Sequence, residues 1–170
     1  MRAPRLLAAA LLALSLLIGG CGFQLRGAKP LPFHTLYLAI PENSELGADL
    51  RRQIKALGST QLVNKREEAE AIFSTQADLR ERLVLSYNNA GQVREIQLRY
   101  RYVYRIQNAK GQTLGQPGEV VLTRDVTYDD AQLLSKAAEE ELLWQDMQRD
   151  LVQQLLRRLA ATKMTAVATE

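Results

Sequence analysis

The segment of residues 92–107 constrains the fold more than any other part of the chain, because its apolar and polar residues alternate. The even-numbered positions from 96 onward are apolar or aromatic: Ile96, Leu98, Tyr100, Tyr102, Tyr104 and Ile106. The odd-numbered positions include charged and amide side chains: Glu95, Gln97, Arg99, Arg101 and Arg105. Successive side chains of a β-strand point to opposite faces, so the pattern predicts one long strand with a buried face and a polar face.

Two further strands flank this one and predict an antiparallel meander. One covers about residues 71–87, with a bend or bulge near residues 78–82 where its alternation slips, and the other covers about residues 112–128, with an interruption at residues 115–118. The connections at residues 88–91 and 108–111 contain asparagine and end in glycine, which favour tight turns.

The first helix is predicted between a short strand and a glycine. Residues 35–40 alternate and end at Pro41, which favours a strand. Asn43 or Ser44 then caps a helix that continues to about Leu57, and Gly58 suits the position just past its C-terminus. Its apolar stripe is Leu46, Leu50, Ile54 and Leu57.

A second helix is predicted at the end of the chain, beginning at Asp129 or Asp130, or else at Ser135. Its apolar stripe is Leu143, Met147, Leu151, Leu155 and Leu159. The element order β-α-β-β-β-α predicts an α+β fold, in which two helices pack on one face of a roughly four-stranded, largely antiparallel sheet.

Cys21 is the one cysteine, and it follows a hydrophobic leader. Arg2 and Arg5 precede the uncharged run of residues 6–18, and two glycines stand directly before the cysteine. This build is that of a secretory signal peptide, and its end resembles a bacterial lipobox. We therefore expect cleavage after residue 20 and a Cys21 that carries S-diacylglycerol and N-palmitoyl chains as a membrane anchor. The alternative is a plain secreted protein with one free cysteine.

The expected domain organisation follows from the leader. Residues 1–20 are predicted to be the cleaved signal peptide, residues 21–34 a tether, residues 35–160 one domain, and residues 161–170 a flexible tail. Loss of Arg2 and Arg5 reduces the 22 basic residues to 20, against 19 acidic residues. A nearly neutral domain does not favour a nucleic-acid partner.

The residues that would carry catalysis or metal binding are sparse. His34 is the one histidine, so it has no second imidazole with which to share a metal, and the carboxylates at residues 139–141 suit a solvated helix face. Residues 111–118 are rich in glycine but precede a predicted strand, whereas a phosphate loop requires a helix there. We therefore expect neither an enzyme nor a cofactor or metal site.

The polar face of residues 92–107 allows two interpretations. It is either an ordinary solvated sheet face, or a surface for a partner or an anionic ligand, because guanidinium groups bind phosphates in a bidentate manner. In the second interpretation the arginines of adjacent strands would cluster: Arg80, Arg82, Arg94, Arg99, Arg101 and Arg105. The three tyrosines of the opposite face suit the core.

The start of the mature chain resembles the LPS-assembly lipoprotein LptE (RlpB) family. Residues 21–27 read Cys-Gly-Phe-Gln-Leu-Arg-Gly, and that family begins Cys-Gly-aromatic-x-Leu-Arg. The resemblance continues through the element order, the turn at Gly91, the entry to the last helix at residues 129–136, and the terminal Leu-Leu-Arg-Arg-Leu of residues 155–159.

The resemblance implies an outer-membrane lipoprotein that faces the periplasm, plugs the LptD β-barrel, assists barrel assembly and takes part in delivering lipopolysaccharide to the outer leaflet. It implies lipopolysaccharide contacts at Lys136 and, less closely in register, at Arg94. We expect Arg99, Arg101 and Arg105 to face the partner. The alternative function is a periplasm-facing lipoprotein that binds an anionic envelope polymer or scaffold without a barrel partner.

Overall fold

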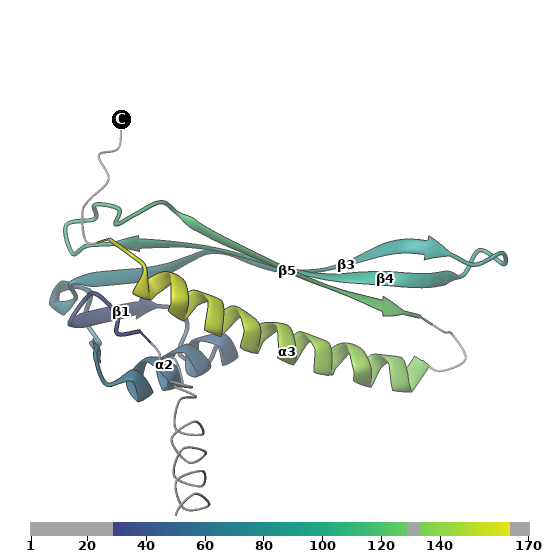
Figure 1. The fold of residues 1–170 in the computed structure, drawn as a ribbon, viewed down its shortest axis with the longest axis horizontal. Helices are drawn as coiled ribbons and strands as arrows, with labels where there is room; N and C mark the ends of the chain where they lie inside the picture. Colours follow the sequence, from purple (N-terminus) through teal and green to yellow (C-terminus); the bar gives the residue numbers. More distant parts are fainter. Residues whose placement is uncertain (1–28, 129–132, 164–170) are drawn as a thin grey trace, which may run out of the picture.

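The long alternating strand is present as β4 (Val93–Gln107), which has a neighbouring strand on each side in the sheet of Figure 1. The computed structural model describes residues 29–128 and 133–163. All six even-numbered side chains from Ile96 to Ile106 are buried, and the odd-numbered ones are partly exposed. The period of two therefore decided which face of β4 packs in the core, as predicted.

The sheet has five strands, so the expectation of about four was one strand short. The strands are β1 (Thr35–Ala39), β2 (Gln61–Leu62), β3 (Ala71–Tyr87), β4 and β5 (Gly118–Thr127), in the spatial order β2-β1-β3-β4-β5. The long strands β3, β4 and β5 pair antiparallel, whereas β1 pairs parallel with both β2 and β3. The extra strand is the two-residue β2, which is too short to show alternation in the sequence.

A β-bulge in β3 lies earlier than the predicted irregularity. Thr75 pairs with Tyr104 and Ala77 pairs with Val103, so Gln76 is the extra residue. Pairing then runs without a shift through residues 77–84, including the stretch where we expected the slip, and shifts again beyond Val84. A bulge adds one residue to one strand, so it exchanges the two faces for every residue after it.

Helix α2 (Glu45–Leu57) has the predicted caps at both ends. The backbone amide of Gly47 donates to Oγ of Ser44 at 3.1 Å, which satisfies one of the free amides of the first turn. Gly58 follows the helix with a φ of 66°, a left-handed conformation that glycine adopts without a steric penalty. The buried side of α2 presents Leu46, Leu50 and Ile54.

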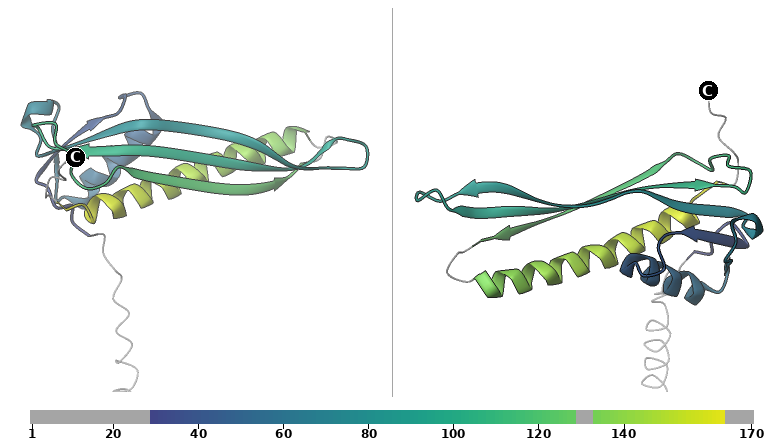
Figure 2. Two further views of the ribbon diagram at one scale, coloured as in Figure 1. Left: turned by 90° about the horizontal axis from the view of Figure 1, so that it is seen from above. Right: turned by 180° about the vertical axis from the view of Figure 1, so that it is seen from behind.

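Helix α3 (Leu133–Ala160) is the longest helix and begins between the two predicted starts. Both helices lie on the same side of the sheet, while the short 3₁₀ helix η1 (Arg66–Glu68) connects β2 to β3 (Figures 1 and 2). The face of α3 toward the sheet buries Trp144, Met147, Leu151, Val152, Leu155 and Leu159. This arrangement confirms the α+β architecture with helices on one face.

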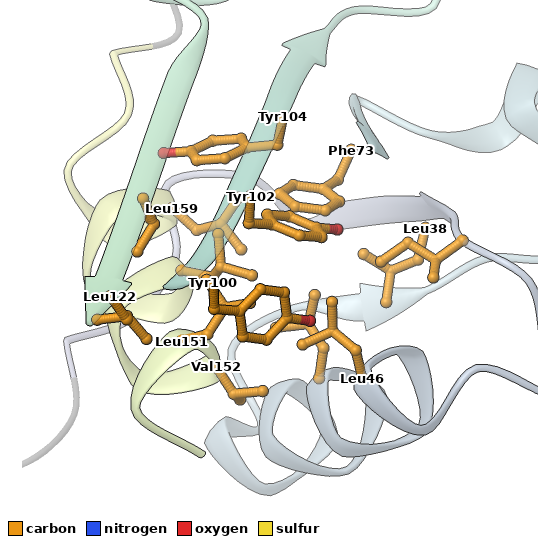
Figure 3. Packing of buried hydrophobic residues seen from close by; sticks show 14 of the residues in the cluster. Leu38, Leu46, Phe73, Tyr100, Tyr102, Tyr104, Leu122, Leu151, Val152 and Leu159 are labelled. Atoms are coloured by element: carbon orange, nitrogen blue, oxygen red, sulfur yellow. The ribbon is translucent and has the colours of Figure 1, made fainter. Parts of the chain in front are cut away.

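Aromatic rings of β3 and β4 fill the space between the sheet and the helices (Figure 3). The ring of Phe73 stacks on that of Tyr104 with 5.2 Å between centroids, and the ring of Tyr100 meets Trp144 edge-on at 6.3 Å. Offset and edge-on contacts are the geometries that aromatic pairs favour. Leu31 and Phe33, within the segment expected as a tether, are also buried.

The β3–β4 hairpin gives the molecule its length. Its turn lies at one end of the long axis, past the ends of β5 and α3, whereas α2 lies toward the other end (Figure 1). We call residues 83–93 the hairpin end. It comprises the last part of β3, the turn and the first residue of β4.

Candidate functional site

The face of the sheet turned away from the helices, here called the outer face, carries the arginines predicted to meet a partner. Nη1 of Arg99 lies 3.9 Å from Oε2 of Glu81, and Nε of Arg101 donates to Oε1 of Glu119 at 2.5 Å. Arg105 shares this face, and its Nε is buried without a hydrogen-bond partner among the described residues. Two of the three arginines are therefore paired with carboxylates of the neighbouring strands.

The charges of the outer face are close to balance. The register places four carboxylates beside these three arginines: Glu81, Glu95, Glu119 and Asp125. Glu95 accepts a hydrogen bond from the hydroxyl of Ser86 at 2.8 Å, and Asp125 accepts one from the amide of Gln97 at 2.8 Å. Such a face suits water or a polar protein surface, and it lacks the excess of cations that an anionic polymer would require.

Arg80 and Arg82 do not join this group, so the predicted six-arginine cluster is wrong. Both face the helices, because the bulge at Gln76 exchanges the faces of the residues after it. Arg80 pairs with Tyr100 and Arg82 with Leu98, both of which are buried positions of β4. The same exchange turns Leu79 and Leu83 to the outer face, where both side chains are exposed.

The arginines of the inner face join the sheet to α3. The guanidinium carbon of Arg80 lies 4.9 Å from the ring centroid of Tyr100, and its Nη2 donates to Oε1 of the buried Gln148 at 2.9 Å. Nε of Arg82 lies 3.2 Å from a carboxylate oxygen of Glu140. Burial, with the carboxylate of Asp78 nearby, raises the pKa of the Tyr100 phenol. These contacts have a structural role.

A polar groove lies between the two helices. Its volume is about 380 Å³, and its walls include Asp49 and Arg52 of α2 and Gln145, Gln148 and Arg149 of α3. Gln148 donates to Oδ2 of Asp49 at 3.1 Å, and Asp49 also pairs with Arg52. The hydrogen bond between Gln148 and Asp49 thus joins α3 to α2 across the groove.

The two predicted lipopolysaccharide contacts lie at the end of the molecule where α3 begins. Lys136 is in the first turn of α3, and its Nζ lies 2.8 Å from Oε2 of Glu139, with 19% of the side chain exposed. Arg94 is exposed near the start of β4, and its carbonyl accepts a hydrogen bond from the amide of Tyr128 at 2.7 Å. Since β5 ends beside Arg94 and α3 follows, both cations belong to one end of the fold.

The residues considered for other chemistry have structural surroundings. The backbone amide of His34 donates to Oε2 of Glu70 at 2.6 Å, and its side chain is exposed. Residues 111–117 form a turn and an irregular segment anchored by the buried Leu114. A strand follows this segment, as predicted, but β5 begins at Gly118 and not near residue 112. Within residues 29–128 and 133–163, no group of three His, Cys, Asp or Glu side chains is placed to hold a metal.

Cys21, where we expect a lipid anchor, lies outside the described residues. Among the helices that the structure describes, none is both long and apolar enough to span a membrane.

One feature of the hairpin end escaped sequence reasoning. Its side chains Leu83, Val84, Leu85 and Tyr87 are all exposed, although they belong to a long strand of the sheet. The sequence does show that residues 83–93 contain no charged residue. It does not show which of these side chains point toward the helix side and which point outward, because that depends on the position of the bulge in β3.

Comparison with protein families gives a match over nearly the whole described domain. The model of the family LptE, described as lipopolysaccharide-assembly, matches residues 33–159. No curated protein gave a significant match.

Solved lipoprotein structures share the fold. The solution structure of uncharacterized lipoprotein B from Nitrosomonas europaea is 43% identical, with a TM-score of 0.71, and the alignment covers 82% of this chain and 91% of that one. The crystal structure of the rare lipoprotein B from Shewanella oneidensis is 25% identical, with a TM-score of 0.65 and coverage of 75% and 95%. A minor lipoprotein from Acinetobacter baumannii is 25% identical, with a TM-score of 0.63 and coverage of 78% and 94%.

Proposed function

This chain belongs to the LptE family of lipopolysaccharide-assembly proteins, and we propose that it plugs an LptD-type β-barrel of the outer membrane. In this proposal it assists the assembly of the barrel and takes part in inserting lipopolysaccharide into the outer leaflet. An acylated Cys21 tethers it to the membrane at the periplasmic face. The family match over residues 33–159 carries the proposal, because it spans both layers of the fold.

The surface of the domain supports a position inside a barrel. The interior of an outer-membrane barrel is largely polar, so most of the surface of a plug should be polar as well. The outer face of the sheet meets this need with paired charges, such as Arg101 with Glu119 and Arg99 with Glu81. Each charge of these pairs has an opposite charge beside it within the domain, which lowers the free-energy cost of placing it against the polar wall of the barrel.

The end of the fold that carries Lys136 and Arg94 supports a lipopolysaccharide contact. Lysine and arginine both bind phosphate groups, lysine as a point charge and arginine in a bidentate manner. Lys136 has one carboxylate within 2.8 Å and remains partly exposed, so a phosphate can compete with Glu139 for the ammonium group. The proposed role is therefore one of binding, without a catalytic step.

Co-purification with the full-length acylated protein tests the proposal. A tagged wild-type protein is extracted with detergent from outer membranes of its native bacterium, and its partners are identified by mass spectrometry. We expect a large β-barrel protein in equal molar amount. Recovery of an envelope polymer or scaffold with no barrel would support the alternative function instead.

Depletion of the protein in the same bacterium gives an independent measurement. We expect lower levels of the mature barrel and of surface lipopolysaccharide. Normal levels of both would contradict a role in barrel assembly and lipopolysaccharide insertion.

A further inference from the structure

The hairpin end is an exposed apolar surface without charge. Residues 83–93 read Leu-Val-Leu-Ser-Tyr-Asn-Asn-Ala-Gly-Gln-Val, and 63% of Tyr87 is exposed. Exposed apolar groups that gather at one place on a soluble domain mark an interaction site, whereas scattered ones do not. Here four large side chains lie within five residues: Leu83, Val84, Leu85 and Tyr87.

Both faces of the hairpin end are apolar. Leu83 pairs with Gln97 and faces outward, whereas its neighbour Val84 pairs with Ile96 and faces the helix side. Leu83 is exposed because the helices lie on the opposite side of the sheet, and Val84 is exposed toward the end of the hairpin, past which α3 does not extend (Figure 1). A flat partner would cover one face and leave the other in water, so the partner must surround the hairpin.

The turn at the tip is polar and rigidly built. Oδ1 of Asn88 accepts hydrogen bonds from the amides of Ala90 and Gln92, each at 2.9 Å. Its Nδ2 donates to Oε1 of Gln92 at 3.0 Å, and all five residues of the turn are exposed. Ordering before binding reduces the entropy that binding costs, so the hairpin end is preorganised for a protein contact.

A lipid layer fits this end less well than a protein. The amide groups of the tip would lose water in an acyl layer without gaining partners, which is costly. The apolar side chains lie behind the tip, along the sides of the hairpin, where a bilayer approached tip-first would meet them last.

We propose that residues 83–93 insert into an uncharged, partly apolar socket of the protein partner, which encloses both faces of the hairpin. This inference rests on the proposed function, because the enclosing partner is the barrel. It adds that affinity for the barrel is concentrated in Leu83, Leu85 and Tyr87, and that the paired charges of the outer face contribute less.

Two measurements on the full-length acylated protein test this inference. A photo-crosslinking amino acid at position 87 is expected to give an adduct with the barrel protein. The double variant Leu85→Asp with Tyr87→Asp is expected to lower the amount of co-purified barrel about tenfold, since aromatic anchors dominate interfaces. The matched control is the double variant Leu134→Asp with Leu142→Asp on α3, where the side chains are 89% and 64% exposed and the two added charges are the same.

The outcomes separate this inference from the proposed function. If wild-type protein captures no barrel, the proposed function fails. If wild type captures the barrel and the hairpin double variant captures as much, or if the α3 double variant gives an equal loss, the inference alone is overturned. A position-87 adduct with lipid or with a second copy of this chain overturns it as well. Thermal unfolding of each variant verifies that the domain is intact.

Discussion

The ring of Tyr104 lies over Gly118, its partner across β4 and β5, and fills the space that a β-carbon on that glycine would need. Tyr104 also stacks on Phe73, so the ring has little freedom to move away. We therefore expect Gly118→Ala to lower the free energy of unfolding by about 1–3 kcal/mol, as overpacked cores do.

Urea unfolding measures this cost, and Tyr104→Leu provides the control. In the Tyr104→Leu background the added methyl group has room, so Gly118→Ala should cost well under half as much there. Equal costs in the two backgrounds would show that the ring is not what excludes a side chain at position 118.

Arg80 and Arg99 provide a matched pair on opposite faces of the sheet. Arg80→Met removes the contact with the ring of Tyr100 and a donor to the buried Gln148, so we expect a loss of about 1–2 kcal/mol. Arg99→Met removes a surface pair with Glu81, so we expect a change within about 0.5 kcal/mol. Denaturant unfolding of the two variants checks the difference, and equal losses would contradict the assignment of Arg80 to the helix side.

Three buried tyrosines predict a loss of stability at alkaline pH. Burial raises the pKa of Tyr102 from 10.0 to about 12, and it raises the pKa of Tyr100 and Tyr104 in the same direction. The folded state therefore favours the neutral phenol, and above pH 10 the unfolded chain loses its protons first. The contribution of these buried phenols to the free energy of unfolding is complete below about pH 10. It decreases as the pH rises from about 10 to about 12, by about 1.4 kcal/mol per pH unit for each tyrosine.

Unfolding by urea from about pH 8 to about pH 12, on both sides of the ordinary tyrosine pKa, tests this dependence. Tyr102→Phe should reduce the slope above pH 10, because one ionising group is gone. It should also cost about 1 kcal/mol at neutral pH, because the hydroxyl lies 2.6 Å from Oγ1 of Thr75. A slope identical to that of wild type would contradict the prediction.

The turns at the two ends of β4 have the same design. Asn108 repeats every hydrogen bond of Asn88, since its Oδ1 accepts from the amides of Lys110 and Gln112 and its Nδ2 donates to Gln112. We expect Asn88→Ala and Asn108→Ala to cost similar amounts, about 1 kcal/mol each. Thermal unfolding compares them, and a difference above about 1 kcal/mol would show that one turn depends on contacts beyond its own residues.

Lys136→Asp tests the proposed lipopolysaccharide contact. The reversal of charge places a carboxylate beside Glu139, so we expect binding to purified lipopolysaccharide to fall at least about fivefold. Stability should change little, because partly exposed single charges rarely govern it. Lys110→Asp, in the exposed turn at the other end of β4, is the control for net charge. Unchanged binding by Lys136→Asp, or an equal loss with Lys110→Asp, would remove Lys136 as a specific contact.

Most of the fold was predictable because each long element carries its own periodicity. The alternation of β4 and the stripes of α2 and α3 each select a buried face from local sequence, and Ser44 and Gly58 mark the helix ends. The two-residue β2 was not predictable as a strand, because its place in the sheet comes from parallel pairing with β1. The cations Lys136 and Arg94 were named from a family resemblance, and the structure places both at the end where α3 begins.

The sequence by itself determined the class of fold and the inward face of β4. Tertiary structure decided which residues of β3 face the core. The alternation in the sequence of β3 does not decide which of its two faces is buried. One extra residue at Gln76 turns Arg80 toward the helices and Leu83 toward the outer face. The physical reason is that side chains alternate between the two faces along a strand, so one bulged residue exchanges the faces of the residues that follow it. The pairing of β3 with β4 selects where that bulged residue falls.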